Sequence, residues 1–65
     1  MSLRIEIGRE VDGRWIAEVV DLPGVMVYGQ DRESAIAAVK DLARRVIDER
    51  REHGESAPEP IFSLT

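Results

Sequence analysis

The sequence predicts a small α+β domain whose elements follow the order strand, strand, strand, helix, strand. Near the start of the chain, Leu3, Ile5 and Ile7 alternate with other residue types, which is the period of a strand with one buried face. Between residues 35 and 47 the apolar residues instead keep the spacing of a helix with one apolar stripe. A chain of 65 residues has room for one domain, so we expect residues 1–65 to fold as a single unit.

The turn near Asp12 and Gly13 joins the first two predicted strands and admits two registers. A two-residue loop would set Ile7 opposite Glu18. A three-residue loop, with Gly13 in the left-handed conformation, sets Ile7 opposite Ala17 instead. Because a slip of one residue sends every side chain to the opposite face, the side-chain pattern favours the three-residue loop. That register gathers these residues on one face: Leu3, Ile5, Ile7, Trp15, Ala17 and Val19.

A second turn follows at residues 21–24, which read Asp-Leu-Pro-Gly. Pro23 presets one turn angle and cannot donate a hydrogen bond to a strand ladder, while Gly24 accepts the positive φ of a type II turn. We therefore expect the second strand to end there and a short third strand to run from Val25 to Tyr28.

A helix is predicted to begin after Asp31, whose side chain is suited to cap the first turn. Its end is predicted at Gly54, after a run of charged residues from position 48 onward that should project into solvent. Residues 61–65 have room for one last strand, and we expect Phe62 and Leu64 to be its inward side chains.

These elements combine into one four-stranded mixed sheet. Three consecutive strands form an antiparallel meander, and a right-handed crossover through the helix lets the fourth strand add in parallel to the first. The predicted strand order is 3-2-1-4, with the single helix packed on one face. The apolar stripe of the helix and the inward face of the sheet then form the core. We expect Trp15 to contribute much of its buried surface.

Composition narrows the classes of function. The formal net charge of -4 repels a phosphate backbone, so we expect no direct binding to nucleic acid and favour a basic protein partner. No apolar run approaches the roughly 20 residues of a membrane span, and no signal peptide is visible. We therefore expect a cytoplasmic protein that does not enter a membrane. The chain has no cysteine, which excludes disulfides and sulfur-ligated zinc.

The sequence carries no pattern of catalytic residues. His53 is the single histidine, near a predicted helix end where a positive charge suits the helix dipole, and a zinc site would need three or four clustered ligands. Two-metal nuclease chemistry would need several converging carboxylates. Glu6 and Glu18 share a face of the predicted sheet, but Arg4 and Arg14 share it too, as expected of a solvated face. We expect no enzyme activity, no metal and no cofactor.

The sheet face that the helix leaves uncovered is the candidate functional surface. It mixes apolar with charged residues, and an apolar patch rimmed by charge suggests an interaction surface. We assign to it the residues Ile16, Glu18, Val20, Met26 and Tyr28. A few scattered exposed hydrophobic residues are the alternative interpretation. Self-association through this face or through the free strand edges predicts a homodimer, or a tetramer built as a dimer of dimers.

The stretch from Asp12 to Ala35 contains, in order, an Asp-Gly turn, an aromatic residue, the pattern x-Ala-x-Val, the tetrapeptide Asp-Leu-Pro-Gly and a glycine before the helix. This stretch resembles the HicB-like antitoxin family. It departs from the family at Val20, where proline is usual, at Val25, where cysteine is frequent, and at Asp31, where threonine commonly opens the helix. None of these departures breaks the strand and turn pattern.

The resemblance implies a truncated ribonuclease-H-like fold and a non-catalytic antitoxin of a type II toxin-antitoxin system. Its partner would be a small basic HicA-type toxin that cleaves messenger RNA, and the antitoxin would neutralise it by covering its active surface. Many such antitoxins continue into a DNA-binding helix-turn-helix or ribbon-helix-helix segment. This sequence ends at Thr65, so we expect no C-terminal DNA-binding domain. The alternative, from another class, is a stand-alone module that self-assembles or binds a small ligand.

Overall fold

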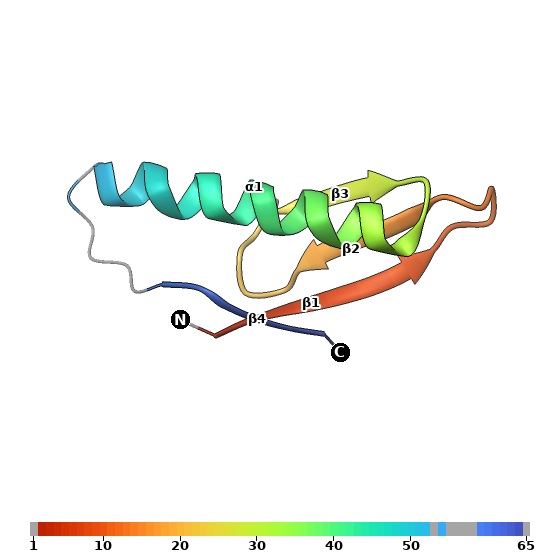
Figure 1. Cartoon of the computed structure of the whole chain (residues 1–65), viewed down its shortest axis with the longest axis horizontal. Coiled ribbons are helices and arrows are strands. Elements are labelled where there is room, and N and C mark those ends of the chain that lie inside the picture. Colours follow the sequence, from red (N-terminus) through yellow and green to blue (C-terminus); the bar gives the residue numbers. More distant parts are fainter. Residues whose placement is uncertain (1, 53, 55–58, 65) are drawn as a thin grey trace.

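One helix lies across one face of a four-stranded sheet in the computed structural model, which describes residues 2–52, 54 and 59–64 (Figure 1). The elements are β1 (Ser2–Arg9), β2 (Trp15–Val19), β3 (Met26–Gly29), α1 (Arg32–Glu52) and β4 (Ile61–Leu64). The strand order is β3-β2-β1-β4, with β4 parallel to β1 and the other neighbouring pairs antiparallel. The α+β class, the mixed sheet and the order 3-2-1-4 predicted from the sequence are therefore confirmed.

The hairpin of β1 and β2 has the three-residue loop that the side-chain pattern favours. Ile7 lies opposite Ala17, Gly13 has a φ of 94°, and the Gly13 N–H donates to the Glu10 carbonyl at 3.0 Å. This register turns alternate side chains of both strands toward α1. Four of them are at most 1% exposed: Leu3, Ile5, Ala17 and Val19.

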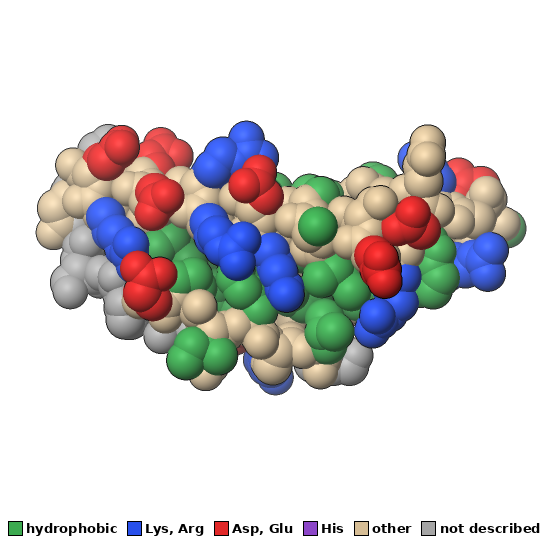
Figure 2. Space-filling model, in the orientation of Figure 1, with side chains coloured by type: hydrophobic (Ala, Val, Ile, Leu, Met, Phe, Trp, Pro, Cys, Tyr) green, Lys and Arg blue, Asp and Glu red, His purple; other side chains and the backbone are tan. Residues whose placement is uncertain are grey.

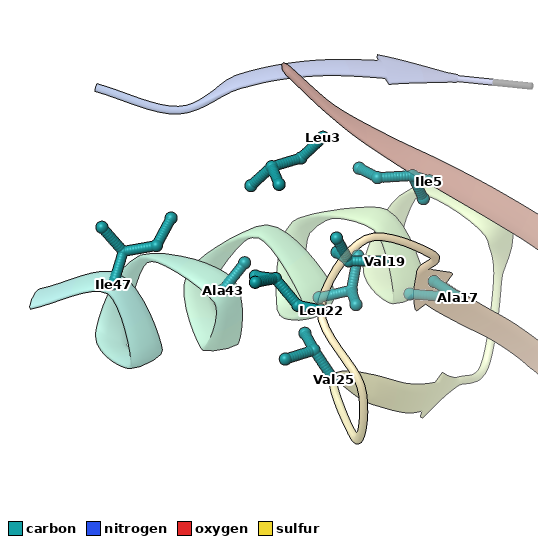
Figure 3. Close-up of a cluster of buried hydrophobic side chains, with 10 residues drawn as sticks. Leu3, Ile5, Ala17, Val19, Leu22, Val25, Ala43 and Ile47 are labelled. Atoms are coloured by element: carbon teal, nitrogen blue, oxygen red, sulfur yellow. The ribbon is translucent and has the colours of Figure 1, made fainter. Parts of the chain in front are cut away.

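The turn after β2 contributes to the core as well as reversing the chain. Gly24 has a φ of 84°, and the Val25 N–H donates to the Leu22 carbonyl at 3.2 Å, as in a type II turn. Leu22 and Val25 are only 4% and 3% exposed, and both side chains point into the cluster between helix and sheet (Figure 3). The prediction that the third strand begins at Val25 is wrong by one residue, because Val25 closes this turn and β3 begins at Met26.

The helix α1 begins and ends where the sequence predicts. The Ser34 N–H donates to Asp31 Oδ1 at 2.7 Å, and this hydrogen bond lowers the pKa of Asp31. At the other end Gly54, with a φ of 84°, donates its N–H to the Arg51 carbonyl at 3.0 Å. The prediction about His53 falls outside the described residues. In the described part of the chain, no helix combines the length and hydropathy that crossing a membrane requires.

The core fills the space between α1 and the strands β1 and β2, closed at one end by the turn after β2 (Figure 3). The helix contributes one residue from each successive turn, at a spacing of four. The buried hydrophobic residues are Leu3, Ile5, Ala17, Val19, Leu22, Val25, Ala35, Val39, Ala43 and Ile47. Among the described residues no polar or charged residue is buried, so apolar packing stabilises the fold.

Several residues expected in the core lie at its margin, among them Ile7 and Phe62, which are only partly buried. Trp15 packs against the core but is only half-buried, and the Arg9 guanidinium lies 5.6 Å from the centroid of its ring. Leu64 is 48% exposed, although Phe62 on the same strand packs against the core. The reason is that α1 contacts β2 and β3 far more than β1, which leaves β4 largely uncovered. Pairing with Leu3 and Ile5 confirms that Phe62 and Leu64 lie on the inward side of β4, but the helix does not cover Leu64, and Trp15 is a marginal core residue.

A glycine at the end of β3 lets the helix approach the sheet. A Cβ placed on Gly29 would lie 2.6 Å from the backbone nitrogen of Ala35 and 2.9 Å from its Cα. Ala35 is the first fully buried residue of the helix. The φ of Gly29 lies outside the left-handed region, so this position requires a glycine for space rather than for backbone conformation.

Candidate interaction surface

The sheet face opposite α1 carries the residues that the sequence assigns to a candidate surface. We call it the outer face and define it by Ile16, Glu18, Val20, Met26 and Tyr28. Pairing of β2 with β3 sets Ile16 opposite Tyr28 and Glu18 opposite Met26. Directly opposed residues of an antiparallel pair point to the same side of the sheet. The structure thus brings the two strands' contributions together on one surface.

Most apolar side chains of the outer face are open to solvent. Met26 is 47% exposed, Tyr28 is 48% exposed and Val20 is 39% exposed. The Val20 N–H donates to the Arg4 carbonyl at 2.9 Å, so pairing with β1 continues one residue beyond β2. Neighbouring exposed side chains of this size are typical of a surface that contacts a partner.

A shallow depression lies on the outer face, where β1 passes beside β2. Its lining residues are Glu6, Ile7, Gly8, Ile16 and Glu18. Gly8 lies opposite Ile16, and a Cβ on Gly8 would come within 3.3 Å of Ile16 Cγ2. The absence of a side chain at position 8 therefore keeps one side of Ile16 accessible between two carboxylates.

Glu6 and Glu18 lie directly opposite each other across β1 and β2. Both are exposed, and neither forms an ion pair with another described residue. Directly opposed residues have Cβ atoms about 5 Å apart, and like charges at that distance repel. The pair therefore destabilises the isolated domain slightly, and a cation brought by a partner would remove the repulsion.

The cations beside the outer face are already paired. The Arg4 guanidinium lies 3.5 Å from Asp21 Oδ1, while the Arg4 backbone N–H donates to Asp21 Oδ2 at 2.8 Å. Arg14 Nε lies 2.7 Å from Asp12 Oδ2. These backbone and side-chain hydrogen bonds lower the pKa of Asp21 and of Asp12. The Arg14 guanidinium also lies 4.6 Å from the centroid of the Tyr28 ring. Arg4 and Arg14 thus each form an ion pair with an aspartate, whereas Glu6 and Glu18 form none with another described residue.

The residues of this face have no arrangement suited to catalysis. Among the described residues, no three histidine, aspartate or glutamate side chains gather closely enough to hold a metal ion. Two-metal chemistry needs more converging carboxylates than the pair Glu6 and Glu18 supplies. The absence of enzyme activity stays a prediction.

Two features of the surface were not anticipated from the sequence. The depression beside Ile16 could have been found, because a glycine inside a strand pattern often marks a place of close approach. The neutralisation of Arg4 by Asp21 could not, because it depends on how the turn after β2 folds back against β1. That ion pair changes the interpretation of the face from a balanced mixture of charges to an acidic surface.

Comparison with known proteins finds similarity over most of the chain. A protein of Thermoplasma acidophilum named as a UPF0150 protein is 28% identical over 58 residues, which cover 89% of this chain and 84% of that protein. The chain is similar to a UPF0150 protein. The printed name states no activity, ligand or partner for that relative. No family model matches the chain, and no solved structure matches it.

Proposed function

We propose that this chain is a HicB-like antitoxin, a non-catalytic protein-binding domain that acts in the cytoplasm. It would neutralise a small basic HicA-type toxin that cleaves messenger RNA. The observation that carries the proposal is the opposed pair Glu6 and Glu18 beside the accessible side of Ile16, neither of which forms an ion pair with another described residue. The net charge of -4 supports a basic partner, and the motif pattern between Asp12 and Ala35 supports the family.

A basic partner suits this surface for two physical reasons. Its lysine or arginine side chains could approach Glu6 and Glu18 without first breaking an ion pair within the antitoxin. Apolar side chains of the partner could bury Met26 and Tyr28, which gives the apolar centre and charged rim common to protein interfaces. Charge complementarity also accelerates encounter, and the acceleration falls as salt is added.

The test is co-expression with the small basic protein encoded by a neighbouring reading frame. The wild-type chain should form a complex with that protein and relieve its toxicity, and the affinity should fall with rising salt. The antitoxin proposal would be refuted if the co-expressed neighbouring protein neither formed a complex with this chain nor lost its toxicity.

Glu6→Gln combined with Glu18→Gln tests the surface itself. We expect a loss of affinity of about tenfold or more, since each tenfold corresponds to about 1.4 kcal/mol. The same double variant should be at least as stable as the wild type, because it removes a like-charge contact. The matched control is Glu33→Gln with Glu49→Gln, two exposed positions on α1, which should bind normally. Equal affinity in both double variants would move the binding surface elsewhere.

Self-association is a second candidate, favoured by the exposed side chains of Val20, Met26 and Tyr28. In this proposal a second copy covers these side chains in a homodimer or in a dimer of dimers. Closed two-fold contacts are the commonest arrangement in small oligomers. A domain of this size buries little surface on its own, so oligomerisation would add to its stability.

A further inference from the structure

A second surface lies on the other side of the sheet, where α1 does not cover β4. In Figure 2 basic side chains of the helix stand above a band of hydrophobic side chains. A groove runs here along the flank of α1, and we call it the flank groove. Its lining residues are Glu33, Ile36, Ala37, Lys40 and Arg44. Arg44 also lines a second, polar hollow, which extends from the flank groove to Glu59 and Pro60. These two residues directly precede β4.

The position of Phe62 ties this groove to β4. Lys40 Nζ lies 5.8 Å and the Arg44 guanidinium 5.4 Å from the centroid of the Phe62 ring. Neither cation forms an ion pair with another described residue. Glu33 lies about 10 Å from Lys40 along the helix axis, at a rise of 1.5 Å per residue. Two cations that form no ion pair with another described residue therefore stand above the helix-facing side of β4, although Asp48 and Glu59 line the same hollow as Arg44.

The backbone of β4 offers a free strand edge beside these cations. β4 is the last strand of the sheet, and no other described strand pairs with its outer side. Ile61 is 66% exposed and Leu64 is 48% exposed, and Ile61–Leu64 contains no charged residue. Exposed edges usually carry charged residues, proline or a bulge that prevent pairing with another chain. β4 has none of these within the strand; its protection is limited to its length of four residues and to Pro60 directly before it.

The opposite edge of the sheet is less open. β3 is also an edge strand, but α1 packs closely over it. Val27 of β3 packs against the core as a result. A strand added beside β3 would meet Arg14, which lies over the Tyr28 ring but already forms an ion pair with Asp12. The two edges therefore differ in both access and charge.

We propose that the outer edge of β4 binds an extended, acidic segment of a partner protein as a fifth strand. Backbone hydrogen bonds to β4 would supply affinity, and alternate side chains would supply specificity. On the helix-facing side an acidic residue of the segment meets Lys40 and Arg44, and an apolar residue lies beside Leu64. On the other side an apolar residue covers Ile61. This binding is separate from the proposed antitoxin contact, which uses the opposite face of the sheet.

Charge distinguishes this occupant from a second copy of the chain. A two-fold pairing of β4 with another β4 would bring together Lys40 and Arg44 from both copies. The residues of β4 supply no carboxylate to neutralise them. An acidic segment supplies the missing charge, so complementarity favours it.

Two labelled peptides that differ in charge alone test the proposal. One alternates valine with glutamate, and the other has lysine in place of every glutamate. Fluorescence anisotropy should show binding of the acidic peptide to the wild type and weaker binding of the basic one. Lys40→Glu with Arg44→Glu should weaken the acidic peptide about tenfold or more and strengthen the basic peptide. Circular dichroism of the variant should match that of the wild type, which shows that the exchange of preference comes from a folded protein.

A matched control has the same net charge as the Lys40→Glu, Arg44→Glu variant. Arg45→Glu with Arg50→Glu makes the same change in charge at exposed positions of α1 that do not line the groove, and it should leave the acidic peptide's affinity near that of the wild type. Glu6→Gln with Glu18→Gln should also leave it unchanged, which separates this result from any failure of the antitoxin proposal.

Backbone amide shifts locate the bound peptide. The proposal requires shifts at Ile61–Leu64 and at Lys40 when the acidic peptide is added. Shifts confined to Met26–Gly29 would place the peptide on β3 and overturn it. The proposal would also be overturned if the acidic peptide did not bind the wild type at millimolar concentration. It would be overturned as well if both charge-reversed variants lost the same affinity for the acidic peptide. A dimer whose concentration-dependent shifts map to β4 would assign this edge to a second copy instead.

Discussion

Replacing Gly29 with alanine should destabilise the domain although it adds only one methyl group. The new Cβ would lie 2.6 Å from the backbone nitrogen of Ala35, whereas an unstrained contact needs about 3.4 Å. The first turn of α1 would have to move by roughly 0.8 Å, against a backbone that cannot rotate away. Overpacking of this kind costs about 1–3 kcal/mol. Alanine recovers part of this, about 0.5–1 kcal/mol, because it loses less conformational freedom than glycine in a strand.

We therefore expect Gly29→Ala to lower the free energy of unfolding by about 1–2 kcal/mol, or Tm by roughly 5–15 °C. Urea unfolding followed by circular dichroism measures the difference. Gly8→Ala is the matched control, because its Cβ would lie 3.3 Å from a side-chain methyl, Ile16 Cγ2, rather than 2.6 Å from a backbone atom. That variant should stay within about 0.5 kcal/mol of the wild type. If Gly29→Ala proves as stable as Gly8→Ala, the reasoning from close backbone approach is refuted.

The remaining predictions concern the core margin, the helix cap, assembly and metal. Trp15→Ala should cost less than the about 3–5 kcal/mol typical of a fully buried aromatic, since the ring is half-buried; a variant with wild-type urea stability would place Trp15 outside the core. Asp31→Ala should lower Tm by removing the cap on the Ser34 N–H. The hydrogen bond lowers the pKa of Asp31. The difference in Tm between wild type and variant should therefore have its full size above the ordinary carboxyl pKa of 3.8. It should shrink as the pH falls through the lowered pKa of Asp31 in the folded protein. A Tm difference unchanged down to strongly acidic pH would contradict this. Ile16→Lys with Val20→Lys should turn the proposed homodimer into a folded monomer in sedimentation, and a wild type that is already monomeric at high micromolar concentration would contradict the dimer. A chelator should leave Tm unchanged; a fall would reveal a metal required for folding.

Local patterns predict most of this fold because each strand and turn is specified by residues next to one another. Strand period and the position of Gly13 together select the register of β1 and β2. Contacts between distant segments were harder to anticipate. Leu22 and Val25 belong to a turn by local pattern, and only its folding back beneath α1 buries them. The exposure of Leu64 depends on where the helix crosses the sheet, which the apolar stripe of α1 does not determine.

In the candidate surface, too, features set by local sequence could be predicted and features set by distant contacts could not. The outer face could be predicted, since strand alternation alone places Ile16 and Glu18 together. The negative charge of that face required the pairing of Arg4 with Asp21. The position of the flank groove beside β4 lay beyond sequence reasoning, because it depends on the contact of Lys40 and Arg44 with Phe62, from a strand that follows the helix.

The parallel pairing of β4 with β1 joins the two ends of the chain, since Ser2 lies opposite Ile61. The hairpins and α1 instead form from segments nearer in sequence, and contacts of large sequence separation close the longest loops and form slowly. We therefore expect docking of β4 to be the slow step of folding, and its release to be a local opening of lower free energy than global unfolding. Amide hydrogens of β4 should exchange faster than those of β2 in consequence. Any molecule that binds only the docked form of β4 raises the free energy of this opening, so occupancy of the edge and completion of the fold are thermodynamically linked.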